Sequence, residues 1–88
     1  MPVYVDRACN HYRRMKMCHM IADTEQELHL TANIIGVKRK WYQDKASFPH
    51  YDICKAKREL AIKSGAIEVN RKELVLKMRE IRANEQTS

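Results

Sequence analysis

The chain has 88 residues, the length of a single domain, and a chain of this size buries only about 60–65% of its unfolded surface. Such a thin core would gain buried area from a homodimer. The formal net charge of +6 and the pI of about 9.4 favour polyanionic partners: nucleic acid, a nucleotide or an acidic protein surface. The sequence has no apolar run near the roughly 20 residues of a membrane helix, and its N-terminus lacks the features of a signal peptide.

The cysteines point to the cellular compartment. The chain contains Cys9, Cys18 and Cys54, an odd number, and no C-x-x-C pair. This pattern argues against a disulfide framework and against a cysteine zinc site. We therefore expect a reducing, cytoplasmic setting.

The first half of the chain predicts two strands and a helix. The β-branched and aromatic run at 2–5 predicts a strand that ends at Asp6, residues 7–14 predict a loop, and 15–21 form a weaker strand candidate. A helix is then expected from Thr24, because Thr24 and Glu27 have the spacing of a capping box. Its apolar stripe is Leu28, Ala32 and Ile35, and its end is Gly36.

The second half alternates in the same way. Trp41-Tyr42 predicts a strand, and Asp52 is the expected N-cap of a helix over 53–64. A further strand is expected at 66–69. Asn70 then opens a third helix that reaches about Arg82, with Leu74, Val75, Met78 and Ile81 on one side.

The order of these elements predicts an α/β fold. We expect a single small domain over 1–83, with three or four short strands in a mostly parallel sheet and three helices. Residues 84–88 are expected to form a disordered C-terminal tail.

Polar residues follow several of the expected strands. In open α/β sheets, ligands gather at the carboxyl ends of the strands. Asp6 follows the first strand, and the loop FPHYD, residues 48–52, follows the Trp-Tyr strand. The segment before the first helix brings His19 and Asp23 towards the same edge. We therefore expect one polar rim with His50 and Tyr51 facing a ligand.

The first functional hypothesis is binding of a phosphate-bearing ligand, nucleic acid or nucleotide. Helix N-termini favour acidic residues, yet the second and third expected helices begin with basic ones. An anionic ligand would make these cations favourable. The expected ligand-binding residues are Lys55, Arg58, Arg71, Lys72, His50 and Tyr51. The alternative is that the basic side chains point into solvent.

Two further hypotheses come from different classes. Asp6, His19, Asp23 and Asp52 are suitable ligands for Mg²⁺ or Mn²⁺, which would indicate a metal-dependent phosphodiesterase or nuclease-like hydrolase. Structural roles compete with this, since Asp23 and Asp52 also fit helix caps. The third hypothesis is a protein–protein interaction module, such as a host-factor inhibitor, with an adaptable surface that includes Met15 and Met17.

Five stretches resemble a small family from bacteria and their phages that is catalogued only as a domain of unknown function. They are YVD at 4–6, CHMIADTEQEL at 18–28, IGVKRKWYQ at 35–43, PHYDI at 49–53 and KRELAIKSGAIEV at 57–69. The resemblance implies a cytoplasmic protein, phage-encoded in some cases, and would suit action on a host nucleic-acid or nucleotide system. It supplies no reaction. The positions that it implies are shared are Asp6, His19, Asp23, Gln43, His50, Tyr51 and Asp52.

Overall fold

The computed structural model describes residues 3–7, 10–12, 15–44 and 48–87. The elements in chain order are β1 (Val3–Asp6), β2 (Asn10–Tyr12), β3 (Met15–Ala22), α1 (Glu25–Ile35), the 3-10 helix η1 (Arg39–Trp41), β4 (Tyr42–Gln43), β5 (His50–Cys54), α2 (Lys55–Lys63), β6 (Ile67–Val69) and α3 (Arg71–Thr87).

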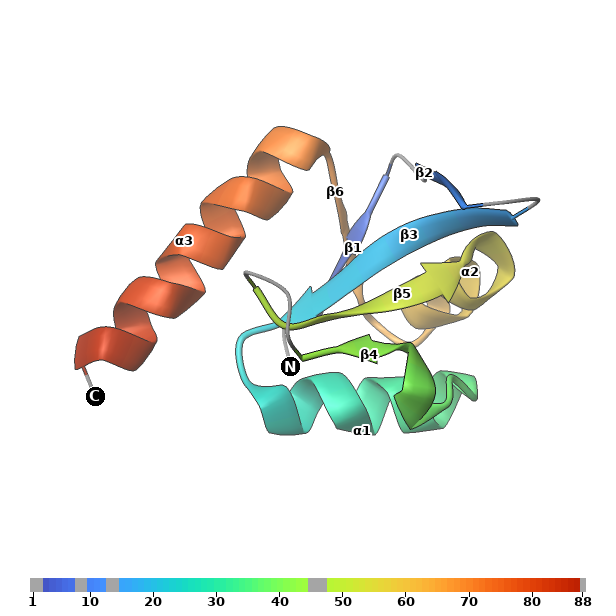
Figure 1. Ribbon diagram of the computed structural model, residues 1–88, viewed down its shortest axis with the longest axis horizontal. Coiled ribbons are helices and arrows are strands. Elements are labelled where there is room, and N and C mark those ends of the chain that lie inside the picture. The colour runs from blue at the N-terminus through green and yellow to red at the C-terminus, as the bar shows by residue number, and fades with distance from the viewer. Residues whose placement is uncertain (1–2, 8–9, 13–14, 45–47, 88) are drawn as a thin grey trace.

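The strands form one mixed sheet in the order β4-β5-β3-β1-β6, with β2 paired to β3 (Figure 1). Of the described pairings, only β1 with β6 is parallel. The predicted α/β class with three helices is confirmed, and the prediction of a mostly parallel sheet is wrong. The reason is β3, a weak candidate in the sequence, which is the central strand and pairs antiparallel with β1 and β5. An element over 10–12 in the expected loop, β2, adds to the antiparallel part.

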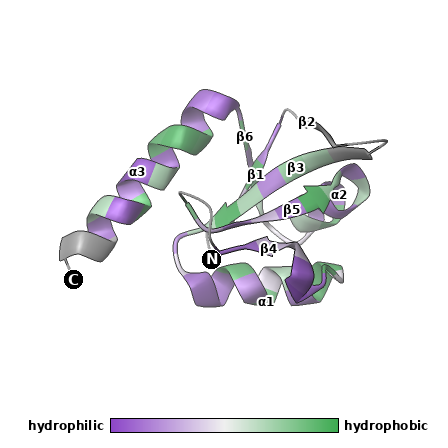
Figure 2. Cartoon of the chain, viewed as in Figure 1, coloured by the Kyte–Doolittle hydropathy of each residue, from purple (hydrophilic) through white to green (hydrophobic). Residues whose placement is uncertain are grey.

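Helices cover both faces of this sheet (Figure 1). On one face, α1 and α2 pack over a core that includes Val5, Met20 and Ile53. On the other face, α3 packs against Tyr4 and Ile21 through its residues Leu74 and Ile81. Along α3, hydrophobic and hydrophilic bands alternate, as expected for a helix that buries one stripe (Figure 2). Because β3 has apolar residues on both faces, it lacks the clean alternation of a half-exposed strand.

Local capping signals fixed α1 as expected. The backbone N–H of Glu27 donates to Thr24 Oγ1 over 3.2 Å at its N-terminus. At its C-terminus, Gly36 adopts φ 78°, the left-handed conformation that ends a helix. A Cβ at Gly36 would also lie 3.2 Å from Lys57 Nζ. The positive φ is what favours glycine at this position, because the Lys57 ammonium ends a flexible side chain that can move aside.

The start of α2 corrects the sequence prediction. Asp52, expected to cap this helix, lies inside β5, and the N-cap is Cys54, which makes no side-chain capping hydrogen bond. The strand β5 therefore includes the last part of the FPHYD run, from His50 onward. Trp41, expected in a strand, ends η1, and only Tyr42–Gln43 form β4.

The start of α3 confirms the prediction from sequence. The backbone N–H of Glu73 donates to Asn70 Oδ1 over 2.8 Å, and the N–H of Asn70 donates to Glu73 Oε1 over 3.1 Å. The helix continues to Thr87, past Arg82, where we expected it to end. The division into a domain over 1–83 and a tail over 84–88 stays a prediction.

The cysteines differ from each other. Cys54 is a free thiol. Cys18 is disulfide-bonded, so the expectation of reduced cysteines is wrong for it, and the cysteine pattern no longer supports a cytoplasmic setting. Within the described part of the chain, none of the helices has the length and apolar character to cross a membrane.

On the face of the sheet that α1 and α2 cover, a chain of polar contacts connects α1 to β5. Burial raises the pKa of the Tyr51 hydroxyl above its usual range, so this group stays protonated and donates. Tyr51 Oη lies 2.7 Å from His29 Nδ1, and His29 Nε2 lies 3.1 Å from Glu25 Oε1. The consistent assignment is that Tyr51 donates to His29, whose other ring N–H donates to Glu25.

Tyr51→Phe should lower the free energy of unfolding by about 1–2 kcal/mol, because it leaves the inward-facing His29 nitrogen without a donor. Urea unfolding at neutral pH measures this. The double variant with His29→Ala should cost less than the sum of the two single changes, since both remove the same hydrogen bond. Full additivity would show that the contact contributes nothing to stability.

Candidate metal centre

Four ionisable side chains lie in a short row across three neighbouring strands. His19 in β3 pairs with Asp52 in β5. On the other side of β3, Val5 pairs with Met20, so the next position of the same register places Asp6 opposite His19. His50 precedes Asp52 by two residues, which puts both side chains on one face of β5. This is the face that carries α3.

Hydrogen bonds fix the orientation of the two imidazoles. His19 Nδ1 lies 3.2 Å from Asp6 Oδ2, and His50 Nδ1 lies 2.8 Å from the carbonyl oxygen of Phe48. A carboxylate and a carbonyl can only accept, so each Nδ1 carries the hydrogen and donates. In a neutral imidazole, the remaining Nε2 then presents a lone pair.

Both lone pairs face the same carboxylate. Asp52 Oδ1 lies 3.3 Å from His50 Nε2 and 3.9 Å from His19 Nε2, and the three atoms lie within 4.8 Å of one another. Three acceptors turned towards one point repel each other unless a proton or a metal ion lies between them. Ligand atoms around a tetrahedral zinc ion are about 3.4 Å apart, from bond lengths of about 2.1 Å. The distance from His50 Nε2 to Asp52 Oδ1, 3.3 Å, is close to that spacing, and the distance from His19 Nε2, 3.9 Å, is longer.

Asp6 is a buried carboxylate that contacts His19. Its residue surface is only 3% exposed, and one oxygen accepts from His19. The other oxygen, Oδ1, is buried and makes no hydrogen bond to any of the described residues. A buried carboxylate is unfavourable unless a cation or donor compensates it. In metalloproteins the histidine ligand commonly donates its second N–H to such a carboxylate, which fixes the ring and raises its basicity.

A cavity of about 170 Å³ opens beside this group. We call it the Arg71 cavity: its polar lining is Asp6, His19, His50 and Arg71, and α3 supplies an apolar wall. Arg71 is the first residue of α3. Among the α3 residues that line this cavity, Arg71 is the one that carries a positive charge and is therefore suited to an anion.

Some of the site residues predicted from the sequence lie together at the candidate metal centre, and others do not. Asp6, His19, His50 and Arg71 line one cavity, and Asp52 joins the histidines. Asp23 is exposed beyond the end of β3 and does not belong to this group of described residues. Gln43 pairs with His50 in the backbone ladder.

The other predicted phosphate-binding residues lie elsewhere. Tyr51 is 1% exposed and packs on the opposite face of the sheet. Arg58 Nη1 lies 3.6 Å from Glu68 Oε1, with only 12% of its side chain exposed. Lys55 and Lys72 are exposed and are absent from the lining of the Arg71 cavity.

Sequence reasoning missed the carbonyl of Phe48 and the shared orientation of the histidines. The available signal was the alternation His50-x-Asp52, which puts two ligand types on one face if 50–54 is a strand. This alternation was overlooked because Asp52 was predicted to cap a helix.

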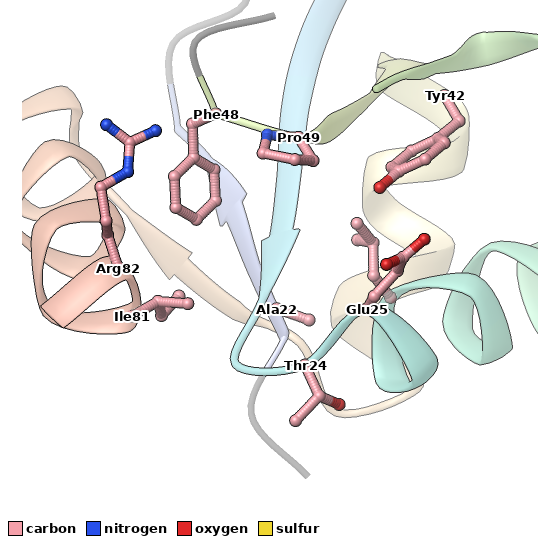
Figure 3. Close-up of a pocket in the computed structure, with 9 residues that line it drawn as sticks. Ala22, Thr24, Glu25, Tyr42, Phe48, Pro49, Ile81 and Arg82 are labelled. Carbon is pink, nitrogen blue, oxygen red and sulfur yellow. The ribbon is translucent and has the colours of Figure 1, made fainter. Parts of the chain in front are cut away.

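Two other cavities flank the sheet. One, of about 90 Å³, lies between the start of α1, β4 and the C-terminal half of α3 (Figure 3). There the Phe48 ring lies beside Arg82, with 5.7 Å between the ring centroid and Arg82 Cζ. Glu25 belongs to the Tyr51 network described above. The other cavity, of about 290 Å³, lies between η1 and β5 and includes Asp52 in its lining.

A comparison with protein families finds one described as "Protein of unknown function (DUF4031)", whose model matches residues 3–81. No curated protein and no solved structure matches the chain.

Asp6→Asn should leave the melting temperature of the metal-free protein unchanged or raise it. The amide oxygen can still accept from His19, while the buried charge is removed. Differential scanning calorimetry in the presence of a chelator measures this, with the exposed Asp44→Asn as the matched control, expected to change stability by less than about 0.5 kcal/mol. A fall of several degrees in Asp6→Asn alone would mean that the carboxylate serves the fold rather than a cation.

Proposed function

This chain belongs to the DUF4031 family, whose description assigns no function, and we propose that it is a metal-dependent phosphoester hydrolase. In this proposal His19, His50 and Asp52 hold a divalent metal ion. Arg71 and the ion together bind a phosphate group of the substrate.

One observation carries the proposal: two histidines donate their Nδ1 hydrogens to fixed acceptors and turn both Nε2 lone pairs towards Asp52 Oδ1. Two imidazoles and one carboxylate suit Zn²⁺, Mn²⁺ or Fe²⁺ better than Mg²⁺, which prefers oxygen ligands. The ions expected from the sequence were Mg²⁺ and Mn²⁺. This donor set supports Mn²⁺, and it makes Zn²⁺ a further candidate.

The chemistry of the Arg71 cavity supports a phosphate-bearing ligand. The planar guanidinium of arginine binds phosphate oxygens in pairs, and its charge does not depend on pH in the physiological range. Arg71 lines the same cavity as His19 and His50. A phosphate at this place would meet the ion on one side and the arginine on the other.

The number of protein ligands supports hydrolysis. Three ligands leave at least one coordination position open for water or substrate. An ion in such a site lowers the pKa of bound water and polarises a phosphoryl oxygen. Held by His19, His50 and Asp52, the ion would supply this activation: water would lose a proton as its oxygen bonds to phosphorus, the P–O bond to the leaving group would break, and the leaving alkoxide would take up a proton, so that the atoms balance.

A second candidate is metal-dependent binding of the phosphate-bearing ligand without turnover. The modest volume of the Arg71 cavity, about 170 Å³, favours it, because many ligand sites are larger, at about 300–1,000 Å³.

Titration with ZnCl₂ and MnCl₂ should reveal one ion bound per chain. At a free ion concentration of about one hundred times Kd, the free energy of unfolding should rise by about 2.7 kcal/mol. Isothermal titration calorimetry and thermal unfolding measure this. His50→Ala and Asp52→Asn should lose the effect, whereas the matched controls His29→Ala and Asp23→Asn should bind the ion like the wild type. Equal binding by all four variants would end the proposal.

The model diester bis(p-nitrophenyl) phosphate should be cleaved in the presence of the bound ion. Arg71→Gln should lower kcat/KM about 10- to 100-fold, because one charge-assisted contact to phosphate is lost, while the ion affinity stays unchanged. The neighbouring Lys72→Gln, with the same change in charge, is the control. Ion binding without any turnover would favour the second candidate, and turnover that survives Asp52→Asn would exclude this site as its source.

A further inference from the structure

The cavity of about 290 Å³ lies at an open edge of the sheet. The backbone pairing of β4 with β5 covers only His50 and Tyr51. Beyond that point, η1 and the end of α1 stand across from β5 in place of a strand. We call this cavity the lysine groove and define it by Lys38, Lys40, Lys57, Trp41, Ile53 and Asp52.

The lysine groove is cationic. Three of its residues are lysines, and Asp52 is the one acid in its described lining. The lysines come from two separate segments, since Lys38 is the N-cap of η1, Lys40 lies within η1, and Lys57 belongs to α2. Charges placed on both sides of a groove suit a ligand that carries more than one negative group along its length.

The floor of the lysine groove is apolar and aromatic. Trp41 is half-buried and packs its inner side against the core, together with Val37. Lys40 Nζ lies 5.7 Å from the centroid of the Trp41 ring. The indole already attracts a cation in this way, and a nucleic acid base that stacks on the same ring face would take the place of the Lys40 ammonium.

The groove and the Arg71 cavity share no described lining residue, and Asp52 is the link between the groove and the candidate metal centre. Asp52 lines the groove, while His19 and His50 line the Arg71 cavity. These three residues form the ligand group. Asp52 is therefore the point at which a ligand in the groove would approach the candidate metal centre.

We propose that the lysine groove binds single-stranded nucleic acid, with a base on Trp41 and the backbone along the lysines. Placing a backbone phosphate at the metal rests on the proposed function; the binding itself does not. The groove has the volume of a small pocket, so it admits an unstacked base and excludes a duplex. A free mononucleotide would use only part of the cationic lining.

Trp41 is the sole tryptophan of the chain, so its fluorescence reports on this groove alone. The experiment titrates the wild-type protein with decathymidylate at 50 mM salt, and follows both tryptophan emission and the anisotropy of a labelled decathymidylate. We expect quenching and anisotropy to give the same dissociation constant, and we expect affinity to fall steeply at 200 mM salt.

Charge variants test the location. Lys38→Gln/Lys40→Gln should weaken binding of decathymidylate at least tenfold. Lys63→Gln/Lys72→Gln makes the same change in net charge at exposed positions outside the groove, and it should weaken binding less than threefold. Lys57 is left intact because its side chain packs beside Gly36.

The outcomes separate this inference from the proposed function. Oligonucleotide that binds without quenching Trp41 would overturn the inference, as would equal losses in the two double variants. Equal or tighter binding of thymidine monophosphate, or of a ten-base-pair duplex, would also overturn it. The zinc affinity of Lys38→Gln/Lys40→Gln should match that of the wild type, so a metal centre that is present without oligonucleotide binding rejects only the inference. Conversely, quenching by decathymidylate that persists in Asp52→Asn and in chelator supports the groove even if no metal binds.

Discussion

The register of β3 between its two neighbours is the constraint on which the candidate site depends. With His19 opposite Asp52 and, by continuation, Asp6, the alternation of the strand sends Cys18 and Met20 into the core on the other face. A slip of one residue would exchange the two faces, burying the imidazole and exposing the apolar side chains. The hydrophobic core beneath α1 and α2 thereby holds the polar row in place.

The two faces of the sheet carry different kinds of polar group. On the face that α1 and α2 cover, the hydroxyl of Tyr51 and the ring of His29 are satisfied within the protein and serve packing. On the other face, α3 leaves the polar row accessible beside Arg71, and Asp6 Oδ1 has no hydrogen-bond partner among the residues that the structure describes. A buried acceptor without a donor lowers the free energy of unfolding, and proteins keep such unfavourable groups mainly at functional sites.

The sequence predicted the members of the polar row better than the reason for their meeting. Asp6, His19, His50 and Asp52 were expected at the carboxyl ends of parallel strands. They come together instead because β1, β3 and β5 are neighbours and largely antiparallel. The same error misplaced Tyr51, because a loop residue can face a ligand, whereas a strand residue next to His50 must point to the opposite face. Trp41 was expected in a strand, and only the gap beside β5 brings it together with Lys38, Lys40 and Lys57 in a groove.

The sequence by itself determined the features that depend only on residues close together in the chain. Thr24 and Glu27 start α1, Gly36 ends it, and Asn70 with Glu73 starts α3, because each involves hydrogen bonds or backbone angles within a few residues. The tertiary structure alone decided the strand order, the antiparallel sense of β3 and the side of the sheet on which each histidine lies. These depend on pairing between segments that are distant in the chain, and on burial of β3 from both faces, which erased the alternation that would have revealed it.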